Sequence, residues 1–141
     1  MWLSHHKSRV RVISLKLAVV TDDGVNVSKH FGRAPYYLVV EVEGGSVKEK
    51  RLVPKLGHTQ FHGAHQQESR GPHMGSDQKH RAIINPVSDC QVVICGGMGM
   101  GAYQSLMLNG IRPIITNIDS ADEAIDAYLN NRMEDHPELL H

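Results

Sequence analysis

The stretch that decides the fold is LKLAVVT, residues 15–21, an apolar and β-branched run that ends at the turn residues Asp22, Asp23 and Gly24. Runs of this composition, bounded by turn residues, are typical of β-strands. We predict that it forms the first and central strand of a sheet.

Two more strands are expected directly downstream. Residues 36–42 (YYLVVEV) and 47–53 (VKEKRLV) flank the turn EGGS at 43–46, and its glycines can adopt the positive φ of a tight hairpin. The pair should be antiparallel. The second strand alternates with charged residues, which suits the edge of a sheet.

The second half of the chain alternates between strands and helices. We expect a helix over residues 78–85, interrupted by Pro86, then a strand at 91–95 and a glycine loop at 96–101. A helix over 102–109 should end at Gly110, because glycine is the common residue just beyond a helix C-terminus. A last strand should occupy 111–116.

The final helix has a clear start signal. Ser120 and Glu123 match a capping box, in which both side chains bind free backbone N–H groups at the start of a helix. One apolar stripe follows at helical spacing, formed by Ala121, Ala124, Ile125, Tyr128 and Leu129. The predicted fold is therefore α/β: a five-stranded mixed sheet, with a three-strand antiparallel meander followed by parallel strands, flanked by helices.

Length and composition favour one domain. The chain has 141 residues, and we predict an N-terminal extension at 1–14, a single domain at 15–130 containing a long loop at 54–77, and a C-terminal tail at 131–141. Fifteen basic and fifteen acidic residues balance, so no overall charge attracts nucleic acid or an anionic membrane. No secretory signal or membrane-spanning run is visible, and cytoplasmic localisation is expected.

The chain has only two cysteines, Cys90 and Cys95. Their spacing of five would place them on opposite faces of one strand, so we expect no disulfide between them. Both are expected to be buried, inert thiols.

The first candidate site follows the central strand, in SKHFGRAP at 28–35. Ligands of open α/β sheets usually bind beyond the carboxyl ends of the strands. His30 offers an imidazole nitrogen to a metal, Arg33 can pair with an anion, and Gly32 allows close backbone approach. The alternative is an ordinary surface turn with a surface ion pair.

The second candidate is the glycine loop, where Gly97, Gly99 and Ala102 fit G-x-G-x-x-A between a strand and a helix, with Asp119 downstream. This allows a nucleotide-binding alternative, although the motif follows the fourth strand and not the first. Backbone amides at Gly97, Met98 and Gly99, with a helix N-terminus, would also suit an anionic sulfide.

The third candidate is the long loop, which contains five histidines: His58, His62, His65, His73 and His80. Their spacing does not match the usual zinc patterns, and a solvated polar loop is the alternative. Imidazoles in one segment can nevertheless converge on a metal without fixed spacing, so His62 and His65 are candidate metal ligands alongside His30.

Several of these segments resemble one family. DDGVNVSKHFGRAPYYLVVEVEGG, DCQVVICGGMGMGAYQSLMLNGIRPIIT and SADEAIDAYLN are similar to the dinitrogenase iron-molybdenum cofactor biosynthesis family, of the NifX, NafY and NifB C-terminal-domain type. The resemblance implies a ribonuclease-H-like fold and binding of iron-molybdenum cofactor or its iron-sulfur precursors, with a histidine, here His30, as one contact and Arg33 as the next. His65 stands where many relatives have cysteine, and imidazole in place of thiolate leaves the identity of the cluster open.

Three classes of function follow. The first is a non-catalytic module that carries a metal-sulfide cluster between a donor and an acceptor protein, as a monomer or weak dimer, without nucleic acid or membrane. The second is a metal-dependent nuclease using Asp22, Asp23 and Glu41. The third is an interaction or regulatory domain that keeps the scaffold without a cluster.

Overall fold

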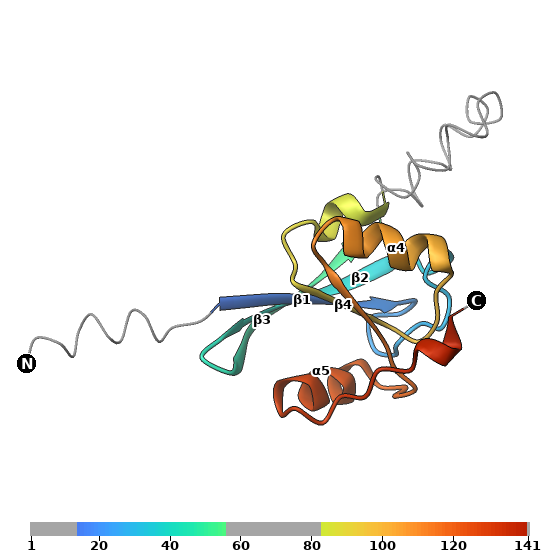
Figure 1. The fold of residues 1–141 in the computed structure, drawn as a ribbon. Helices are drawn as coiled ribbons and strands as arrows, with labels where there is room; N and C mark the ends of the chain where they lie inside the picture. The colour runs from blue at the N-terminus through green and yellow to red at the C-terminus, as the bar shows by residue number, and fades with distance from the viewer. Residues whose placement is uncertain (1–13, 56–82, 141) are drawn as a thin grey trace, which may run out of the picture.

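The computed structural model describes residues 14–55 and 83–140. Their five strands form one mixed sheet in the order β3-β2-β1-β4-β5, with β1 at its centre, as predicted (Figure 1). The strands are β1 (Ser14–Thr21), β2 (Tyr36–Glu43), β3 (Ser46–Pro54), β4 (Val92–Cys95) and β5 (Arg112–Ile115). The predicted extension at residues 1–14 lies outside the described residues except for Ser14, which belongs to β1 and not to an extension. Most of the predicted loop at 54–77 also lies outside them.

Pairing within the sheet follows the predicted pattern. Strand β1 is antiparallel to β2, and β2 to β3, whereas β4 is parallel to both β1 and β5. The β2–β3 hairpin turns at Gly44 and Gly45, whose φ angles of 60° and 84° lie in the region that favours glycine. The meander followed by parallel strands is confirmed.

Side-chain alternation along the strands creates two cores, one on each face of the sheet. Val20 and Val93 point into the core under helix α4 (Met100–Leu108), and Val19 and Ile94 point into the core under helix α5 (Ala121–Leu129). Figure 1 shows the two helices on opposite sides of the sheet. The α/β class with helices on both faces is therefore confirmed.

The ends of helices α4 and α5 lie at or near the residues predicted from the sequence. Helix α4 begins two residues earlier than predicted, at Met100, so the glycine loop is shortened to residues 96–99. Gly110 follows its end with φ 76°. Ser120 Oγ accepts a hydrogen bond from the backbone N–H of Glu123 at 3.2 Å, which confirms the serine half of the predicted box.

The region before β4 differs from expectation. Most of the helix predicted at 78–85 lies outside the described residues, and residues Asn85–Val87 form a 3-10 helix that contains Pro86. Cys90 precedes β4 instead of lying within it, so strand alternation does not apply to the two cysteines. Both thiols are free and lie in the core under α4, and the prediction of opposite faces was wrong.

The residues after α5 return to the sheet and pack against it. The N–H of Ile115 donates to Asp135 Oδ1 at 2.9 Å, and the N–H of His136 donates to the carbonyl of Ile115 at 2.8 Å. A short 3-10 helix, Pro137–Leu139, then brings Leu140 into a parallel bridge with Met98. Within the described ranges, no helix is long and apolar enough to cross a membrane.

Candidate functional site

The candidate site lies at the end of the sheet where most of the strands have their carboxyl ends. Thr21 pairs with Tyr36, Tyr36 pairs with Pro54, and Cys95 pairs with Ile115. The ends of β1, β3, β4 and β5 and the start of β2 therefore meet there. The HFGRAP segment and the glycine loop both leave the sheet at this edge.

These two loops contact each other directly through their backbones. The N–H of Gly96 donates to the carbonyl of Ser28 at 2.7 Å, and the N–H of Phe31 donates to the carbonyl of Gly97 at 3.1 Å. The Cys95 thiol lies between them and donates to the same two carbonyls, at 3.3 Å to Ser28 and 3.0 Å to Gly97. Residues 28–34 and 96–99, called the paired loops below, therefore form one unit.

Gly96 allows this contact. A Cβ at position 96 would lie 2.9 Å from Lys29 Cγ, 3.1 Å from the Ser28 carbonyl oxygen and 3.3 Å from Lys29 Cα. Two of these atoms belong to the backbone and cannot move independently. Only glycine fits without separating the paired loops.

The first of the paired loops, residues 28–34, is a turn stabilised by hydrogen bonds among its own residues. The hydroxyl of Ser28 accepts from the N–H of His30 at 3.1 Å, and the His30 carbonyl accepts from the N–H groups of Arg33 and Ala34 at 3.1 and 3.0 Å. Phe31 and Ala34 are buried in the core under α4. With these two side chains directed inward, those of His30 and Arg33 are exposed.

The second of the paired loops leads into the N-terminus of α4. Gly99 is the N-cap residue and has no side chain to bind the first N–H groups of the helix. This end of the helix carries partial positive charge, as predicted for an anion site. Met98, by contrast, is completely buried in the core under α4. Neither its side chain nor its backbone therefore reaches the surface, and its backbone forms the bridge with Leu140. Gly97 is buried as well, so of the three predicted loop contacts Gly99 alone is partly exposed.

A buried lysine lies beneath the paired loops, and the sequence analysis did not single it out. Lys55 immediately follows β3, and its ammonium donates a hydrogen bond to the carbonyl of Phe31. Burial lowers the pKa of Lys55 to about 8, an effect that nearby Cys95 and Asp22 partly oppose. A single lysine after a charged edge strand has no sequence pattern that distinguishes it from a surface lysine.

The thiol of Cys95 is buried and has the features of an unreactive group. Burial raises its pKa to about 11, and its hydrogen-bonding capacity is used by two carbonyls. Burial likewise raises the pKa of Cys90 to about 11. These are features of structural thiols, since a metal ligand or nucleophile requires an accessible thiolate.

The nucleotide alternative is disfavoured by the packing of the neighbouring loop against the glycine loop. Asp119, the acid expected to bind a ribose, forms an ion pair with Lys29 at 3.6 Å. The carbonyl of Asp119 also accepts from the N–H of Val27 at 2.7 Å. Because residues 28–31 pack directly against Gly96 and Gly97, the loop is occupied by protein on that side.

The nuclease alternative is contradicted by the register of the sheet. Glu41 is paired with Lys16, five residues before Thr21, a separation of roughly 17 Å along the strand. Asp22 and Asp23 follow Thr21 and lie at the opposite end of the sheet from Glu41. They cannot share a pair of metal ions with it, because such ions lie about 4 Å apart.

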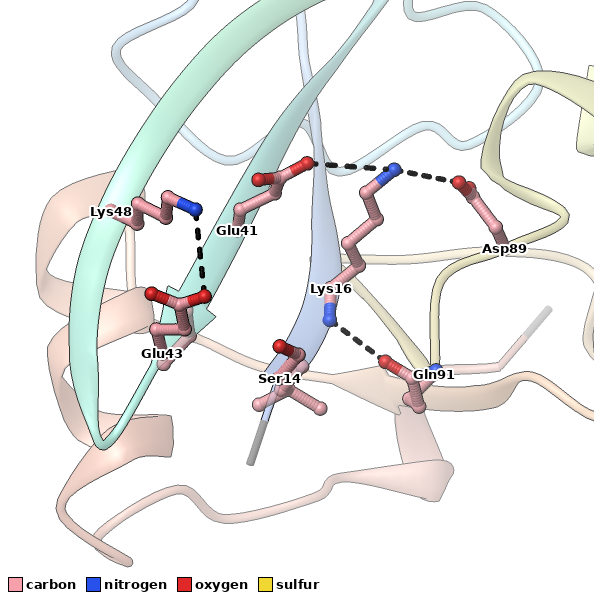
Figure 2. Close-up of a pocket in the computed structure, with 9 residues that line it drawn as sticks. Ser14, Lys16, Glu41, Glu43, Lys48, Asp89 and Gln91 are labelled. Carbon is pink, nitrogen blue, oxygen red and sulfur yellow. Dashed lines mark hydrogen bonds and ion pairs between the residues drawn. The ribbon is translucent and has the colours of Figure 1, made fainter. Parts of the chain in front are cut away.

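The hollow at that opposite end has a volume of about 330 Å³. Figure 2 shows Lys16 reaching both Asp89 and Glu41, at 2.6 and 3.7 Å, and Lys48 reaching Glu43 at 3.4 Å. The hydrogen bond between Lys16 and Asp89 raises the pKa of the lysine and lowers that of the carboxyl group. The charged groups of this hollow are therefore paired with one another.

Metal ligation needs contacts beyond His30. Within residues 14–55 and 83–140, no group of three or more His, Cys, Asp or Glu residues could hold a metal ion. The predicted ligands His62 and His65 lie outside the described residues. The described part of the site offers one exposed imidazole, one exposed guanidinium and a helix N-terminus, a set suited to an anion more than to a bare metal ion.

Similar proteins are known in sequence and in structure. The chain is 26% identical over 125 residues to the uncharacterized protein MJ0580 of Methanocaldococcus jannaschii, covering 89% of this chain and 94% of that protein. The solved structure of PH0822 is similar in fold, with a TM-score of 0.63 and 21% identity, covering 86% of this chain and 96% of that one. The apo form of the orange protein from Desulfovibrio gigas gives 0.60 and 20%, covering 86% and 92%.

A family model, described as dinitrogenase iron-molybdenum cofactor, matches residues 14–131. Among the described residues, the match includes strands β1 to β5, helices α4 and α5, and both of the paired loops. Because it spans most of the sequence, the chain belongs to the dinitrogenase iron-molybdenum cofactor family.

Proposed function

We propose that this protein binds and carries an anionic metal-sulfide cluster, of the iron-molybdenum cofactor or iron-sulfur precursor class, without catalysing a reaction. The proposed contacts are His30, Arg33 and the backbone at Gly99, at the N-terminus of α4. The predicted contacts at Gly97 and Met98 are not retained, because both residues are buried. Family membership supports the class of ligand, and the geometry of the paired loops supports the location.

The observation that carries the proposal is the exposure of two functional side chains on a rigid loop. Residues 28–31 are fixed to the glycine loop by backbone hydrogen bonds, and Phe31 anchors the turn in the core. His30 and Arg33 remain exposed. An imidazole nitrogen can coordinate a metal, whereas a guanidinium binds anions through charge-assisted hydrogen bonds.

The partial positive charge at the N-terminus of α4 also supports an anionic ligand. Its N-terminus follows Gly99 directly and has no side-chain cap. A helix N-terminus favours an anion by about 0.3–1 kcal/mol at an exposed site. Arg33 adds a positive charge on the neighbouring loop, whereas Asp22, Asp23 and Asp119 lie at the same end of the sheet, so the preference for an anion is local to the helix N-terminus.

The remaining parts of the proposal come from the sequence and the family. His62 and His65 would complete the coordination of the cluster from the loop outside the described residues. A donor and an acceptor protein would load and unload it in the cytoplasm, with the carrier as a monomer or weak dimer and without nucleic acid or membrane. We also propose that the fold is of the ribonuclease-H-like type.

Anaerobic binding of tetrathiomolybdate tests the proposal, because this dianion contains molybdenum and sulfide and absorbs visible light. We expect saturable binding by the purified protein. His30→Gln removes the metal-binding imidazole but keeps a polar side chain, and Arg33→Gln removes the guanidinium. Each change should weaken binding by about tenfold, the effect of losing one charge-assisted or ligand contact.

Arg112→Gln is the matched control, since Arg112 is exposed at the start of β5, away from the paired loops. It removes the same charge and should leave binding unchanged. Equal weakening by Arg33→Gln and Arg112→Gln would show non-specific attraction. Full binding by His30→Gln would show that His30 does not contribute to binding this anion.

An interaction domain without a cluster is the second candidate, and one surface favours it. The outer side of α4 exposes Met100, Met107 and Leu108 by 48, 56 and 86%. Exposed apolar groups gathered on one surface often mark protein contacts. Elemental analysis of anaerobically purified protein separates the two candidates, because a pure interaction domain contains no metal and does not bind tetrathiomolybdate.

A further inference from the structure

Lys55 is almost completely buried, which is unusual for a lysine. Only 1% of its surface is exposed. Its backbone N–H donates to the carbonyl of Pro35 at 2.9 Å, at the point where the HFGRAP segment enters β2. The backbone of residue 55 is therefore tied to the far end of the segment that carries His30 and Arg33.

The ammonium group of Lys55 extends under the same segment. It donates to the carbonyl of Phe31 and lies 4.1 Å from the centroid of the Phe31 ring and 5.2 Å from that of Tyr37. Aromatic faces attract a cation, most strongly when water is excluded. These contacts offset part of the cost of removing the charge from water.

Phe31 connects this buried charge to the candidate site. Its carbonyl accepts from Lys55, its N–H donates to Gly97, and its ring fills the core under α4. His30 precedes it in the chain. The main chain at Phe31 is thus held by two hydrogen bonds, one from the Lys55 ammonium to its carbonyl and one from its N–H to the carbonyl of Gly97.

We propose that Lys55 is a positioning residue of the anion site: its buried ammonium fixes the main chain at Phe31 and adds a buried positive charge beneath the paired loops. This inference deepens the proposed function and rests on it for the identity of the ligand class. It also makes a prediction about the protein without ligand, which is independent of that function.

A buried charge acts differently from a surface one. Solvent and salt screen exposed lysines strongly, whereas a charge inside the protein acts through a lower effective dielectric constant. Across roughly 10 Å at an effective dielectric constant of about 20, one unit charge changes the affinity for a singly charged anion by roughly tenfold and that for a dianion by roughly a hundredfold or more. With a pKa of about 8, Lys55 is mostly charged at pH 7.

Three variants separate the two parts of this role. Lys55→Met removes both the hydrogen bond and the charge at similar length, and Lys55→Gln removes the charge while retaining an N–H donor. Lys48→Met is the control, because Lys48 is exposed, pairs with Glu43 and lies at the opposite end of the sheet (Figure 2). All three lower the net charge equally.

Amide hydrogen exchange of the ligand-free protein tests the positioning. The N–H groups of Phe31 and Gly96 report the bonds between the paired loops, and those of β4 report global unfolding. We expect Lys55→Met to increase exchange at the two loop amides about tenfold, while the unfolding midpoint stays equal or rises, because an apolar side chain avoids the cost of burying a charge. Unchanged loop exchange in Lys55→Met would overturn the positioning role.

Equilibrium dialysis with tetrathiomolybdate tests the charge. Both Lys55 variants should bind this dianion at least tenfold more weakly than the unchanged protein and Lys48→Met. Equal affinity in Lys55→Gln and Lys48→Met would overturn the electrostatic role. If the unchanged protein does not bind tetrathiomolybdate, the proposed function fails and the anion role of Lys55 fails with it, whereas the exchange experiment still decides whether Lys55 positions the loop.

Discussion

Replacing Gly96 by alanine tests how the paired loops are held together. The added Cβ would meet the Ser28 carbonyl oxygen at 3.1 Å and Lys29 Cα at 3.3 Å, as well as the side chain of Lys29 at 2.9 Å. The lysine side chain can rotate away, but the two backbone atoms cannot. The loops must therefore separate, which stretches the 2.7 Å hydrogen bond from Gly96 to Ser28.

The expected loss of stability has two parts. Weakening one backbone hydrogen bond costs about 0.5–1.5 kcal/mol, and forcing a methyl group into packed space costs about 1–3 kcal/mol. Together they lower the free energy of unfolding by about 1.5–4.5 kcal/mol. For a domain of this size, where 1 kcal/mol shifts the midpoint by roughly 3–4 °C, Tm should fall by about 5–18 °C.

Thermal unfolding followed by circular dichroism measures this effect, with Gly32→Ala as the matched control. Gly32 lies in the other of the paired loops, and a Cβ there would have no heavy atom within 4 Å. Its substitution should change Tm by no more than about 2 °C. A Gly96→Ala protein that is as stable as Gly32→Ala would refute the close contact.

Three further predictions concern local stability and reactivity. Ser120→Ala removes the hydroxyl that accepts from Glu123 N–H and should cost about 1 kcal/mol by denaturant titration, whereas an unchanged midpoint would contradict the cap. Hydrogen bonds from backbone N–H groups of the following turn lower the pKa of Asp23 to about 2. A lowered carboxyl pKa contributes stability above pH 4 that is lost between about pH 4 and 2. Asp23→Ala should therefore lower Tm strongly at pH 7 and much less at pH 2, and an equal loss at both pH values would contradict these hydrogen bonds. Because burial raises the pKa of Cys90 and Cys95 to about 11, neither thiol should react with a disulfide reagent at pH 8 until the protein is denatured, and fast labelling of the native protein would contradict their burial.

The fold was predictable because local signals in the sequence agree with the tertiary structure. The apolar run of β1, the charged alternation of β3 and the glycine turn between β2 and β3 determine which strands lie at the centre and at the edge. Gly110 and Ser120 mark a helix end and a helix start for reasons of backbone chemistry alone. Such signals act over a few residues and need no knowledge of distant contacts.

The site was less predictable because its parts come together only in three dimensions. Proximity of the His30 segment to the glycine loop followed from the strand order, but the burial of Met98 did not, since a methionine in a glycine loop has no periodic pattern. The predicted position of Cys90 was wrong because strand alternation was applied to residues before the start of β4. Lys55 was missed because its burial depends on Phe31 and Tyr37, which are distant in sequence.

The central claim is that the exposed groups on the paired loops form the binding surface for an anionic metal sulfide. An anaerobic titration of the isotope-labelled protein with tetrathiomolybdate, followed by amide NMR spectra, tests it most directly. We predict saturable shifts confined to residues 28–34 and 96–101, with none at Lys16, Lys48 or Asp89 around the opposite hollow. Shifts centred on that hollow, or the absence of saturable shifts in the paired loops, would contradict the account.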